Sequence, residues 1–501
     1  MTSLKRQVEN TCIQNRWCGD KMVDVAIVQD PELDYCREAP FHPPLKYPEY
    51  PFQHYSRANP VYSAVRMLFL RLGLDKEHYD TDDWNPLGQL ISPGDAVVIK
   101  PNLVRHYNPQ GSMEAQITHG SIIRAVLDYV YLALKGAGTI TIGDAPVQSC
   151  NFEETVKIAG IDKIVDYYNT NTEMRLKLVD FRKYAGYPQK SGAIERIELP
   201  GDPEGYTLVN LGEFSEFSGM NNDWKKFRVT NYDSDVMQKY HNVDSHSYLV
   251  ANSILHADVI INLPKLKTHR KAGMTGALKN MVGIIGSKDC LPHHRIGSQE
   301  EGGDEYLHRD IRKRMATRLH EIQDRTKNPV VGMLGKLGHF LIYGTQRIAP
   351  SPDAYAEGSW YGNDTIPRTI VDLNKIIFFA DKRGILQENP QRKALTVVDA
   401  IIAGEKEGPL EPSPKPIGTL VAGENPVGVD LTCSQIMGFD HHKIPTLKCA
   451  SGLKLINSEQ ATDEIQILAD EIVKLDDVFT RYGHHFNPTS GWKGHIERKG
   501  E

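Results

Sequence analysis

The chain has 501 residues, and its 58 lysines and arginines against 64 aspartates and glutamates give a formal net charge of −6. With 40% hydrophobic and 24% charged residues it can bury a full-sized core, which excludes an intrinsically disordered chain. The slightly acidic balance argues against partnership with nucleic acid or an anionic membrane surface, and no apolar run reaches the roughly 20 residues of a membrane span.

The N-terminus and the cysteines both indicate a cytoplasmic protein. The start of the chain lacks the apolar stretch of a secretory signal, so we expect no export. No two cysteines have the C-x-x-C spacing of a zinc ribbon or a ferredoxin-type cluster, and we expect reduced thiols. The cysteines are at positions 12, 18, 36, 150, 290, 433 and 449.

Short β-branched runs that end in a polar residue, Gly or Pro recur along the chain and predict strands. Such apolar runs are typical of strands that are buried on both faces of a parallel sheet. Helical patterns lie between them, for example over 118–138 and 425–440. This alternation predicts an α/β fold, a mostly parallel sheet with helices on both faces and two large insertions. The predicted strands are residues 23–28, 96–102, 139–146, 258–265, 395–401 and 418–426.

The two insertions interrupt this alternation. Residues 175–250, rich in Gly, Asn, Asp and Tyr, are predicted to form an insertion or lid, and residues 296–392 a mainly helical insertion. The basic helix at 307–327 is either a solvated or subunit-facing surface or a face that binds nucleic acid or phosphate. We expect a homo-oligomer, in which the polar tail at 481–501 is a flexible arm or a strap onto a neighbouring subunit. The remaining predicted parts are an N-terminal arm at 1–22 and an α/β core at 23–174, 251–295 and 393–480.

Polar residues that directly follow the predicted strands are the first candidates for a site, because ligands of open parallel sheets bind at the carboxyl ends of the strands. Their mixture of cations, carboxylates and imidazole suits a small anionic molecule. We expect the cations to neutralise the substrate and the carboxylates to orient its hydroxyl groups or a metal. The expected substrate-binding residues here are Lys100, Asn102, Arg105, Lys265 and Lys267, and the expected carboxylates are Asp144 and Asp399.

The glycine-rich segment 263–295 holds a second set of candidates. His269 follows the two lysines in an alternating pattern that would point all three side chains the same way in an extended conformation. A helix that begins at Gly276 and contains Lys279 and Asn280 would present free N–H groups to a phosphate or carboxylate. We expect His269 to act as acid or base, Lys279 as an electrostatic or cofactor-bearing group, and Asn280 as a substrate ligand.

Two further questions stay open from the sequence. His269, His293 and His294, with a nearby carboxylate, would form a mixed nitrogen and oxygen set for a divalent transition metal, or would serve hydrogen bonding and acid–base chemistry instead. The sequence identifies no other cofactor. Arg368, in an apolar helical segment, either pairs with Asp372 or faces the ligand.

Several stretches of the chain resemble, in family order, the uncharacterised domain of unknown function 362 family. Many relatives also carry a ferredoxin-like segment with clustered cysteines, which this sequence lacks. Where relatives tend to read E-G-x-G-P, this chain reads EKEGP at 405–409. The matching stretches are VVIKPNLV (97–104), ITIGDAP (140–146), ADVIINLPKLKTH (257–269), TGALKNMVG (275–283), LPHH (291–294), VVDAIIAGEKEGP (397–409) and GTLVAGENPVGVDLTCSQIMGFD (418–440).

The order of His269, Lys279 and His293 or His294 is also similar to the nickel-pincer lactate racemase family. That resemblance implies a lysine that carries the pincer cofactor and imidazoles that act as acid–base groups and as a metal ligand. The second imidazole is one or two residues off the family's spacing, so what carries over is the location of a site.

Together these features predict a cytoplasmic enzyme of the isomerase or lyase type. Its substrate would be a small anionic metabolite, such as a hydroxy acid, a sugar acid or a nucleotide-linked compound. The chemistry would be acid–base, with or without a metal. Two other classes stay open, namely a metal- or iron–sulfur-binding redox partner and a non-catalytic binding or assembly protein.

Overall fold

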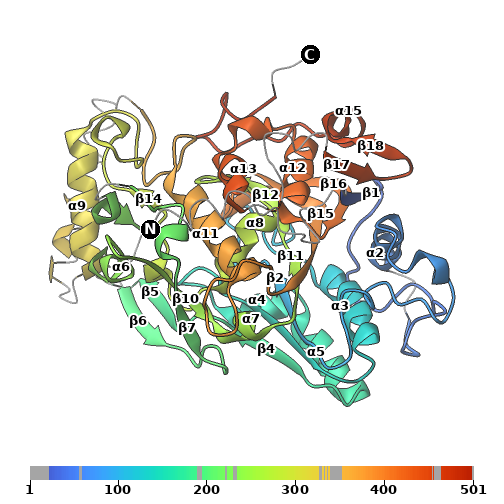
Figure 1. Cartoon of the computed structure of the whole chain (residues 1–501). Helices are drawn as coiled ribbons and strands as arrows, with labels where there is room; N and C mark the ends of the chain where they lie inside the picture. Colours follow the sequence, from blue (N-terminus) through green and yellow to red (C-terminus); the bar gives the residue numbers. More distant parts are fainter. Residues whose placement is uncertain are drawn as a thin grey trace, which may run out of the picture.

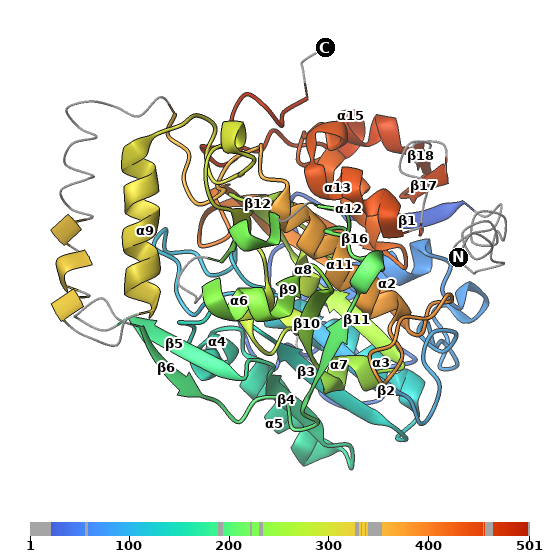
Figure 2. The same ribbon diagram turned by 60° about the vertical axis from the view of Figure 1, so that its left-hand side comes forward.

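The computed structural model describes residues 22–498 with gaps at 56–58, 189–193, 221–222, 230–233, 326–329, 332, 336, 339–352, 454 and 456–463. Within this range the chain forms an α/β fold around one large mixed sheet, with smaller sheets and helices around it (Figures 1 and 2). No described helix combines the length and the apolar character needed to cross a membrane. The predicted arm at 1–22 lies outside the described residues, apart from Met22.

The strands of the whole large sheet are β1 (Val23–Gln29), β2 (Ala96–Pro101), β3 (Thr139–Asp144), β4 (Leu176–Asp180), β11 (Val259–Leu263), β12 (Lys265–His269), β13 (Gly273–Thr275), β15 (Lys393–Glu407), β16 (Glu411–Gly423), β17 (Ile465–Leu468) and β18 (Ile472–Lys474). Parallel strands form one half of this sheet. β4, β3, β2, β11 and β15 lie side by side in this order, each parallel to its neighbour. β12 continues the chain after β11, pairs in parallel with the second part of β15, and is followed by the antiparallel β13.

The other half of the sheet is mixed. β16 runs back antiparallel to β15 and also pairs antiparallel with β1, β17 is parallel to β1, and β18 closes the edge antiparallel to β17. Each predicted run overlaps a strand of this sheet, so the predicted α/β fold with a mostly parallel sheet is confirmed.

Helices cover both faces of the sheet. The flanking helices are α2 (Pro60–Arg71), α3 (Gly120–Leu134), α4 (Phe152–Ile158), α5 (Ile161–Asn171), α7 (Asn252–His256), α8 (Ala277–Asn280), α11 (Thr365–Phe379), α12 (Pro426–Ile436), α13 (Pro445–Cys449) and α15 (Val478–Tyr482). Along β1, Val25 and Ile27 pack into one hydrophobic core with α8, α11 and α12, whereas Ala26 and Val28 pack into a second core with α2 and α3. The alternation of side chains along a strand therefore assigns each strand residue to one of two faces.

The helix α12 begins as the sequence predicts. The Asn425 side chain accepts hydrogen bonds from the N–H groups of Val427 (2.9 Å) and Gly428 (3.2 Å), and Pro426 occupies the first turn, where no N–H is needed. Shortly after the helix ends, Gly438 has a φ of +73°, a conformation that favours glycine.

The structure shifts the boundaries of both insertions. β4 is a strand of the large sheet, so the first insertion begins after Asp180 and not at residue 175. α11 is buried on nearly every side and packs against α8, so it belongs to the core rather than to the second insertion. α9 stands at the edge of the molecule in both views (Figures 1 and 2). The elements of the insertions are β5 (Tyr184–Pro188), β6 (Ile194–Glu198), β7 (Tyr206–Asn210), β8 (Phe227–Arg228), α6 (Ser234–Tyr240), β9 (His241–Asn242), β10 (Ser245–Ala251) and α9 (Ile311–Arg325), with β14 (His294–Arg295) paired to β8.

The C-terminal segment is packed onto its own chain, which corrects the expectation of a free arm, whereas the strap onto a neighbouring subunit stays a prediction. Trp492 is fully buried, and its indole N–H donates a hydrogen bond of 2.8 Å to the carbonyl of Arg270, just after β12. Phe486 and Ile496 are also buried in the core that contains α11 and α12. Residues 481–498 therefore stabilise the glycine-rich segment from outside.

We predict that Trp492→Ala lowers the free energy of unfolding by about 3–5 kcal/mol, because it removes a large, fully buried side chain and its hydrogen bond. Urea denaturation followed by circular dichroism measures the change. Lys493→Ala, at the exposed neighbouring position, is the matched control and should stay within about 0.5 kcal/mol of the parent. Equal stability of the two variants would show that the C-terminal segment is not packed as described.

Candidate functional site

The carboxyl ends of β2, β3 and β12 bring several of the predicted residues together. Lys100 lies near the end of β2, Asp144 ends β3, and Lys267 and His269 lie on β12, which continues beyond the end of β11. Parallel strands end at the same edge of a sheet, which explains why residues more than a hundred positions apart in sequence meet here. α8, with Lys279 and Asn280, packs over this edge.

Lys100 and Asp144 form a buried ion pair at the centre of this edge. The Lys100 Nζ lies 2.7 Å from Asp144 Oδ1, and both side chains are almost completely inaccessible to solvent. Asp144 also accepts hydrogen bonds from the N–H groups of Leu103 (2.7 Å) and Ala145 (2.8 Å). A Cβ at Gly283 would lie 2.0 Å from Asp144 Oδ1, so only glycine fits against the pair. The Asp144 carboxylate thus accepts its hydrogen bonds from Lys100 and from two backbone N–H groups of the protein.

Three asparagines connect the ion pair to the rest of the site. Asn280 donates from Nδ2 to the Lys100 carbonyl (3.1 Å) and to Asn262 Oδ1 (2.8 Å), and its Oδ1 accepts from Asn102 Nδ2 (3.0 Å). Asn102 Oδ1 in turn accepts from Lys267 Nζ (2.6 Å). The sequence analysis identified Asn102 and Asn280 but missed Asn262. This residue could have been recognised as the one polar side chain in the otherwise apolar strand β11.

Lys267 is a fully buried cation whose described partners are neutral. Its Nζ donates to Asn102 Oδ1 and to the carbonyl of Gln116, and no carboxylate of a described residue lies within ion-pair distance. Burial lowers the pKa of this amine well below its usual value, and the positive charges of Lys265 and Lys279 lower it further. Lys267 therefore places an amine in the site that has no carboxylate partner among the described residues, and its burial favours the uncharged form.

Lys279 is partly buried and, among the described residues, makes no hydrogen bond or ion pair. Burial, followed by repulsion from Lys288 and Lys100, lowers its pKa to about 7. The pKa values of Lys288 and Lys271 fall to about 8, in both cases mainly through burial. We call Lys100, Lys267, Lys271, Lys279 and Lys288 the lysine cluster. The sequence analysis missed Lys271 and Lys288, because a lysine in a loop carries no pattern that marks it as buried.

His269 is held in one tautomer by the backbone. Its Nδ1 lies 3.1 Å from the N–H groups of both Lys271 and Ala272, and since these groups can only donate, Nδ1 must carry the lone pair. Burial and the positive charge of Lys279 lower the pKa of the ring well below 6.5, so the imidazole is neutral and its proton is on Nε2. His269 therefore presents a hydrogen-bond donor at Nε2, and the acid–base role expected of it stays a prediction.

His293 has the opposite tautomer. Its Nδ1 lies 2.7 Å from the carbonyl oxygen of Leu291, which can only accept, so Nδ1 carries the proton and Nε2 the lone pair. Burial, and then repulsion from Lys271, lower its pKa well below 6.5. Protonated forms of His269 and His293 would repel each other, so the two rings lie within electrostatic range. The site therefore contains one donating and one accepting imidazole.

The third imidazole lies at the edge of the site. His294 begins β14, is 3% exposed, and its Nδ1 has no hydrogen-bond partner among the described residues. Across the described part of the chain, no three His, Cys, Asp or Glu side chains are gathered as a metal-ligand set. The metal role predicted for His269, His293 and His294 therefore stays a prediction.

A carboxylate occupies the N-terminus of α8, where the sequence analysis expects a bound anion. Asp430 of α12 accepts hydrogen bonds from the N–H groups of Ala277 (2.5 Å) and Leu278 (3.0 Å). A Cβ at Gly276 would lie 2.0 Å from its Oδ1, which explains the glycine. Burial raises the pKa of Asp430 to about 7. The expected anion site is thus filled by the protein itself.

Lys265 and Asp399 form a separate, closed group. Lys265 Nζ lies 2.6 Å from Asp399 Oδ2 and donates to Tyr35 Oη (2.7 Å), which donates to Asp399 Oδ1 (2.5 Å). Lys265 and Asp399 are fully buried, and the Tyr35 ring stacks on His119 with centroids 4.1 Å apart. The two residues therefore satisfy each other and are not open to substrate, contrary to the roles predicted for them. The sequence analysis missed Tyr35 and His119.

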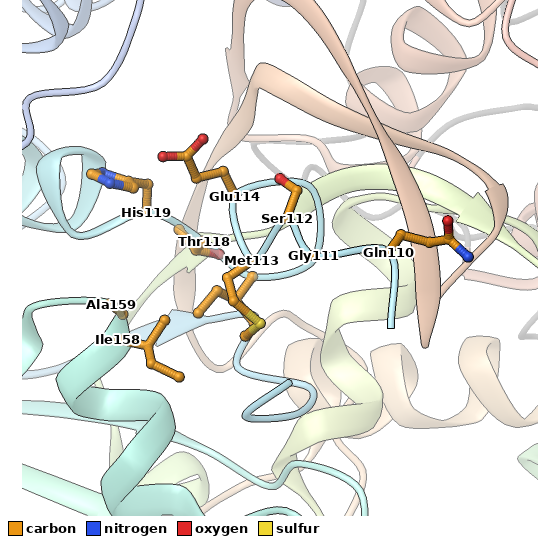
Figure 3. A pocket seen from close by; sticks show the side chains of 10 residues that line it. Gln110, Gly111, Ser112, Met113, Glu114, Thr118, His119, Ile158 and Ala159 are labelled. Atoms are coloured by element: carbon orange, nitrogen blue, oxygen red, sulfur yellow. The ribbon is translucent and has the colours of Figure 1, made fainter. Parts of the chain in front are cut away.

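A cavity of about 560 Å³ lies beside this closed group, between the segment 110–119 and the end of α4 (Figure 3). The same segment faces the site on its other side, since its Gln116 carbonyl accepts from Lys267 and the His119 N–H donates to Asp399 (3.0 Å). Glu114, on the cavity wall, forms an ion pair with Arg37. The cavity and the lysine cluster thus share one wall.

Neither of the two predicted arginines joins the lysine cluster. Arg105 stacks over the Tyr107 ring, with 3.5 Å between its guanidinium carbon and the ring centroid, and donates to the Tyr107 carbonyl. Arg368 pairs with Asp364 (2.9 Å) and donates to the carbonyl of Glu216, so its partner is not the predicted Asp372. Both contacts are structural.

Comparison with known proteins supports the family resemblance seen in the sequence. A thylakoid-associated protein of Synechocystis sp. is 21% identical to this chain over 370 residues, which cover 74% of this chain and 71% of that protein. A family model described as a domain of unknown function (DUF362) matches residues 97–214 and 201–435, a span that includes the whole lysine cluster. The chain therefore belongs to the DUF362 family.

Proposed function

We propose that the protein is an enzyme that moves a proton on a small anionic molecule, in an isomerisation, epimerisation or elimination. The observation that carries this proposal is the pair of neutral imidazoles with opposite tautomers near the Lys279 amine, which has no partner among the described residues. A base, a hydrogen-bond donor and a cation are the groups that proton abstraction next to a carboxylate or a carbinol needs.

The tautomers assign a role to each group. The lone pair on His293 Nε2 takes a proton from the carbon next to a carboxylate, the electrons of the broken C–H bond form a double bond to the carboxylate carbon, and the π electrons of its C=O group move onto the oxygen. The Nε2–H of His269 and the ammonium group of Lys279 stabilise the negative charge that develops on that oxygen. The protonated His293 then returns the proton to carbon or to a leaving group. Lys100, Asp144 and the three asparagines hold these groups in place.

We also propose that the protein works in the cytoplasm as a homo-oligomer and has no nucleic-acid or membrane partner. These proposals rest on the sequence, in particular on its net charge of −6. Most basic residues of α9 are paired with carboxylates, for example Arg314 with Glu301 and Lys313 with Asp353, which supports a role of this helix other than binding nucleic acid.

A non-catalytic binding or assembly role is the second candidate function. Three large apolar side chains of α9 favour it, because Ile311, Met315 and Ile322 are 74%, 52% and 47% exposed. The name of the Synechocystis relative also describes an association, with thylakoids. An assembly protein would show none of the His293-dependent exchange described next.

We predict that the protein catalyses exchange of carbon-bound hydrogen with solvent. Anionic metabolites, incubated with the protein in D2O, should incorporate deuterium at the carbon next to a carboxylate or a carbinol. His293→Gln should slow incorporation by about 10²–10⁴-fold, because it removes the base. His442→Gln, at an exposed position, is the matched control and should keep the parent rate. Exchange that survives in His293→Gln would contradict the assignment of the base.

We predict a second effect on the pH dependence of this exchange. Lys279 is charged below its pKa of about 7, so kcat/KM should fall as the pH rises through 7 to 8. On the acid side it should fall only where His293 becomes protonated, well below pH 6.5. Lys279→Arg keeps its charge and should lose the alkaline decline, whereas Lys279→Met should lose about 10²–10³-fold at every pH. An unchanged alkaline decline in Lys279→Arg would rule out Lys279 as its origin.

A further inference from the structure

Among the buried cations elsewhere in the described structure, Arg124 and Arg182 are paired with carboxylates, whereas Arg392 donates to four backbone carbonyls. Arg124 lies 2.7 Å from Asp128, and Arg182 lies 2.6 Å from Asp180. Pairs of this kind are the usual way in which a protein offsets the cost of taking a charge out of water. They provide the standard against which the lysine cluster can be compared.

The lysine cluster departs from this standard. Asp144 is paired with Lys100, and Lys271 lies near the carboxylates of Glu305 and Glu357. Lys267 donates to an amide oxygen and a carbonyl, and Lys288 donates to the carbonyls of Ala145 (2.8 Å) and Val282 (3.3 Å). Lys279 has no described partner. The amines of Lys267, Lys279 and Lys288 therefore have no carboxylate within ion-pair distance among the described residues.

We propose that the lysine cluster binds a substrate group that carries two negative charges on one centre, of which a phosphate monoester is the simplest example. This inference deepens the proposed function and rests on it only for the identity of the site. Lysine binds phosphate as a point charge, whereas planar carboxylates are typically held by the forked guanidinium of arginine. The cluster is built from lysines, and both predicted arginines are engaged elsewhere. This composition favours a phosphate over a carboxylate.

Binding of such a group has a consequence for protons. The amines of Lys279 and Lys288 are partly uncharged near neutral pH, because burial and their mutual repulsion favour the neutral form. A bound dianion would favour the charged form, so it should bind together with a proton. The groups that act electrostatically on Lys279 are Lys100 of β2, Asp144 of β3, Lys271 after β12 and Lys288 after α8, and Lys279 in turn acts on His269 and His293.

Sulfate is the probe of choice, because it keeps two charges on one centre at every pH of interest. Isothermal titration calorimetry with sodium sulfate, at an ionic strength held constant with sodium chloride, should show saturable binding to one site. Acetate, a single charge, should bind at least tenfold more weakly. Malonate, whose two charges are on separate carboxylates, should also bind more weakly, and equal affinity for malonate would overturn the assignment to a phosphate-like group.

Two variants locate the binding, and one controls for net charge. Lys279→Met and Lys267→Met should each weaken sulfate binding by at least tenfold. Both should fold, because they replace an uncompensated cation with an apolar side chain of similar length. Lys382→Met, at an exposed lysine outside the cluster, should bind sulfate as the parent does. Unchanged binding in both cluster variants would place the sulfate elsewhere and overturn the proposal.

Two further measurements distinguish this inference from the proposed catalytic function. The apparent enthalpy of sulfate binding at pH 7.5 should change between buffers of different ionisation enthalpy, by an amount that corresponds to proton uptake. His293→Gln should bind sulfate like the parent while its deuterium exchange is lost. A protein without exchange activity that still binds sulfate through Lys279 would contradict the proposed function and leave the anion site intact. A buffer-independent enthalpy would contradict the coupling to protons.

Discussion

The ion pair between Lys100 and Asp144 is the interaction on which the rest of the site depends. It places one carboxylate at the carboxyl ends of β2 and β3, and that carboxylate is saturated by Lys100 and two backbone N–H groups. Every further lysine at this edge therefore adds charge that the pair cannot neutralise. Burial is the main cause of the lowered pKa values of Lys279, Lys288, His269 and His293, and repulsion from neighbouring lysines lowers these values further.

Hydrogen bonds from the surrounding elements keep this unfavourable arrangement in place. Asp430 caps the short helix α8, Asn280 joins two strand ends, and Gly283 lets the backbone approach the ion pair closely. The packed C-terminal segment adds a hydrogen bond from Trp492 to the Arg270 carbonyl, within the glycine-rich segment. A group of buried amines without carboxylate partners, held by hydrogen bonds from neighbouring elements, is the pattern expected of a site that is completed by a ligand.

The strands and their carboxyl-end residues could be predicted from sequence because buried parallel strands have a distinctive apolar pattern, and the strand ends of such sheets converge. Which of these residues join the lysine cluster and which form separate ion pairs could not be predicted. Lys265 and Lys267 are two positions apart in sequence. Lys265 pairs with Asp399 and donates to Tyr35, which is 230 positions away, whereas Lys267 donates to Asn102 and belongs to the lysine cluster. The tautomers of His269 and His293 likewise depend on backbone groups whose orientation no sequence pattern indicates. The boundary at β4 was missed because this edge strand has a mixed apolar and polar sequence.

The central claim is that His269 and His293 are both neutral and hold their protons on opposite ring nitrogens. Long-range 15N–1H correlation spectra of the histidine-labelled protein, assigned with the two His→Gln variants, measure this directly at pH 7. The account predicts a proton on Nε2 of His269 and on Nδ1 of His293, with neither ring charged. The same tautomer in both rings, or a protonated ring at pH 7, would contradict it.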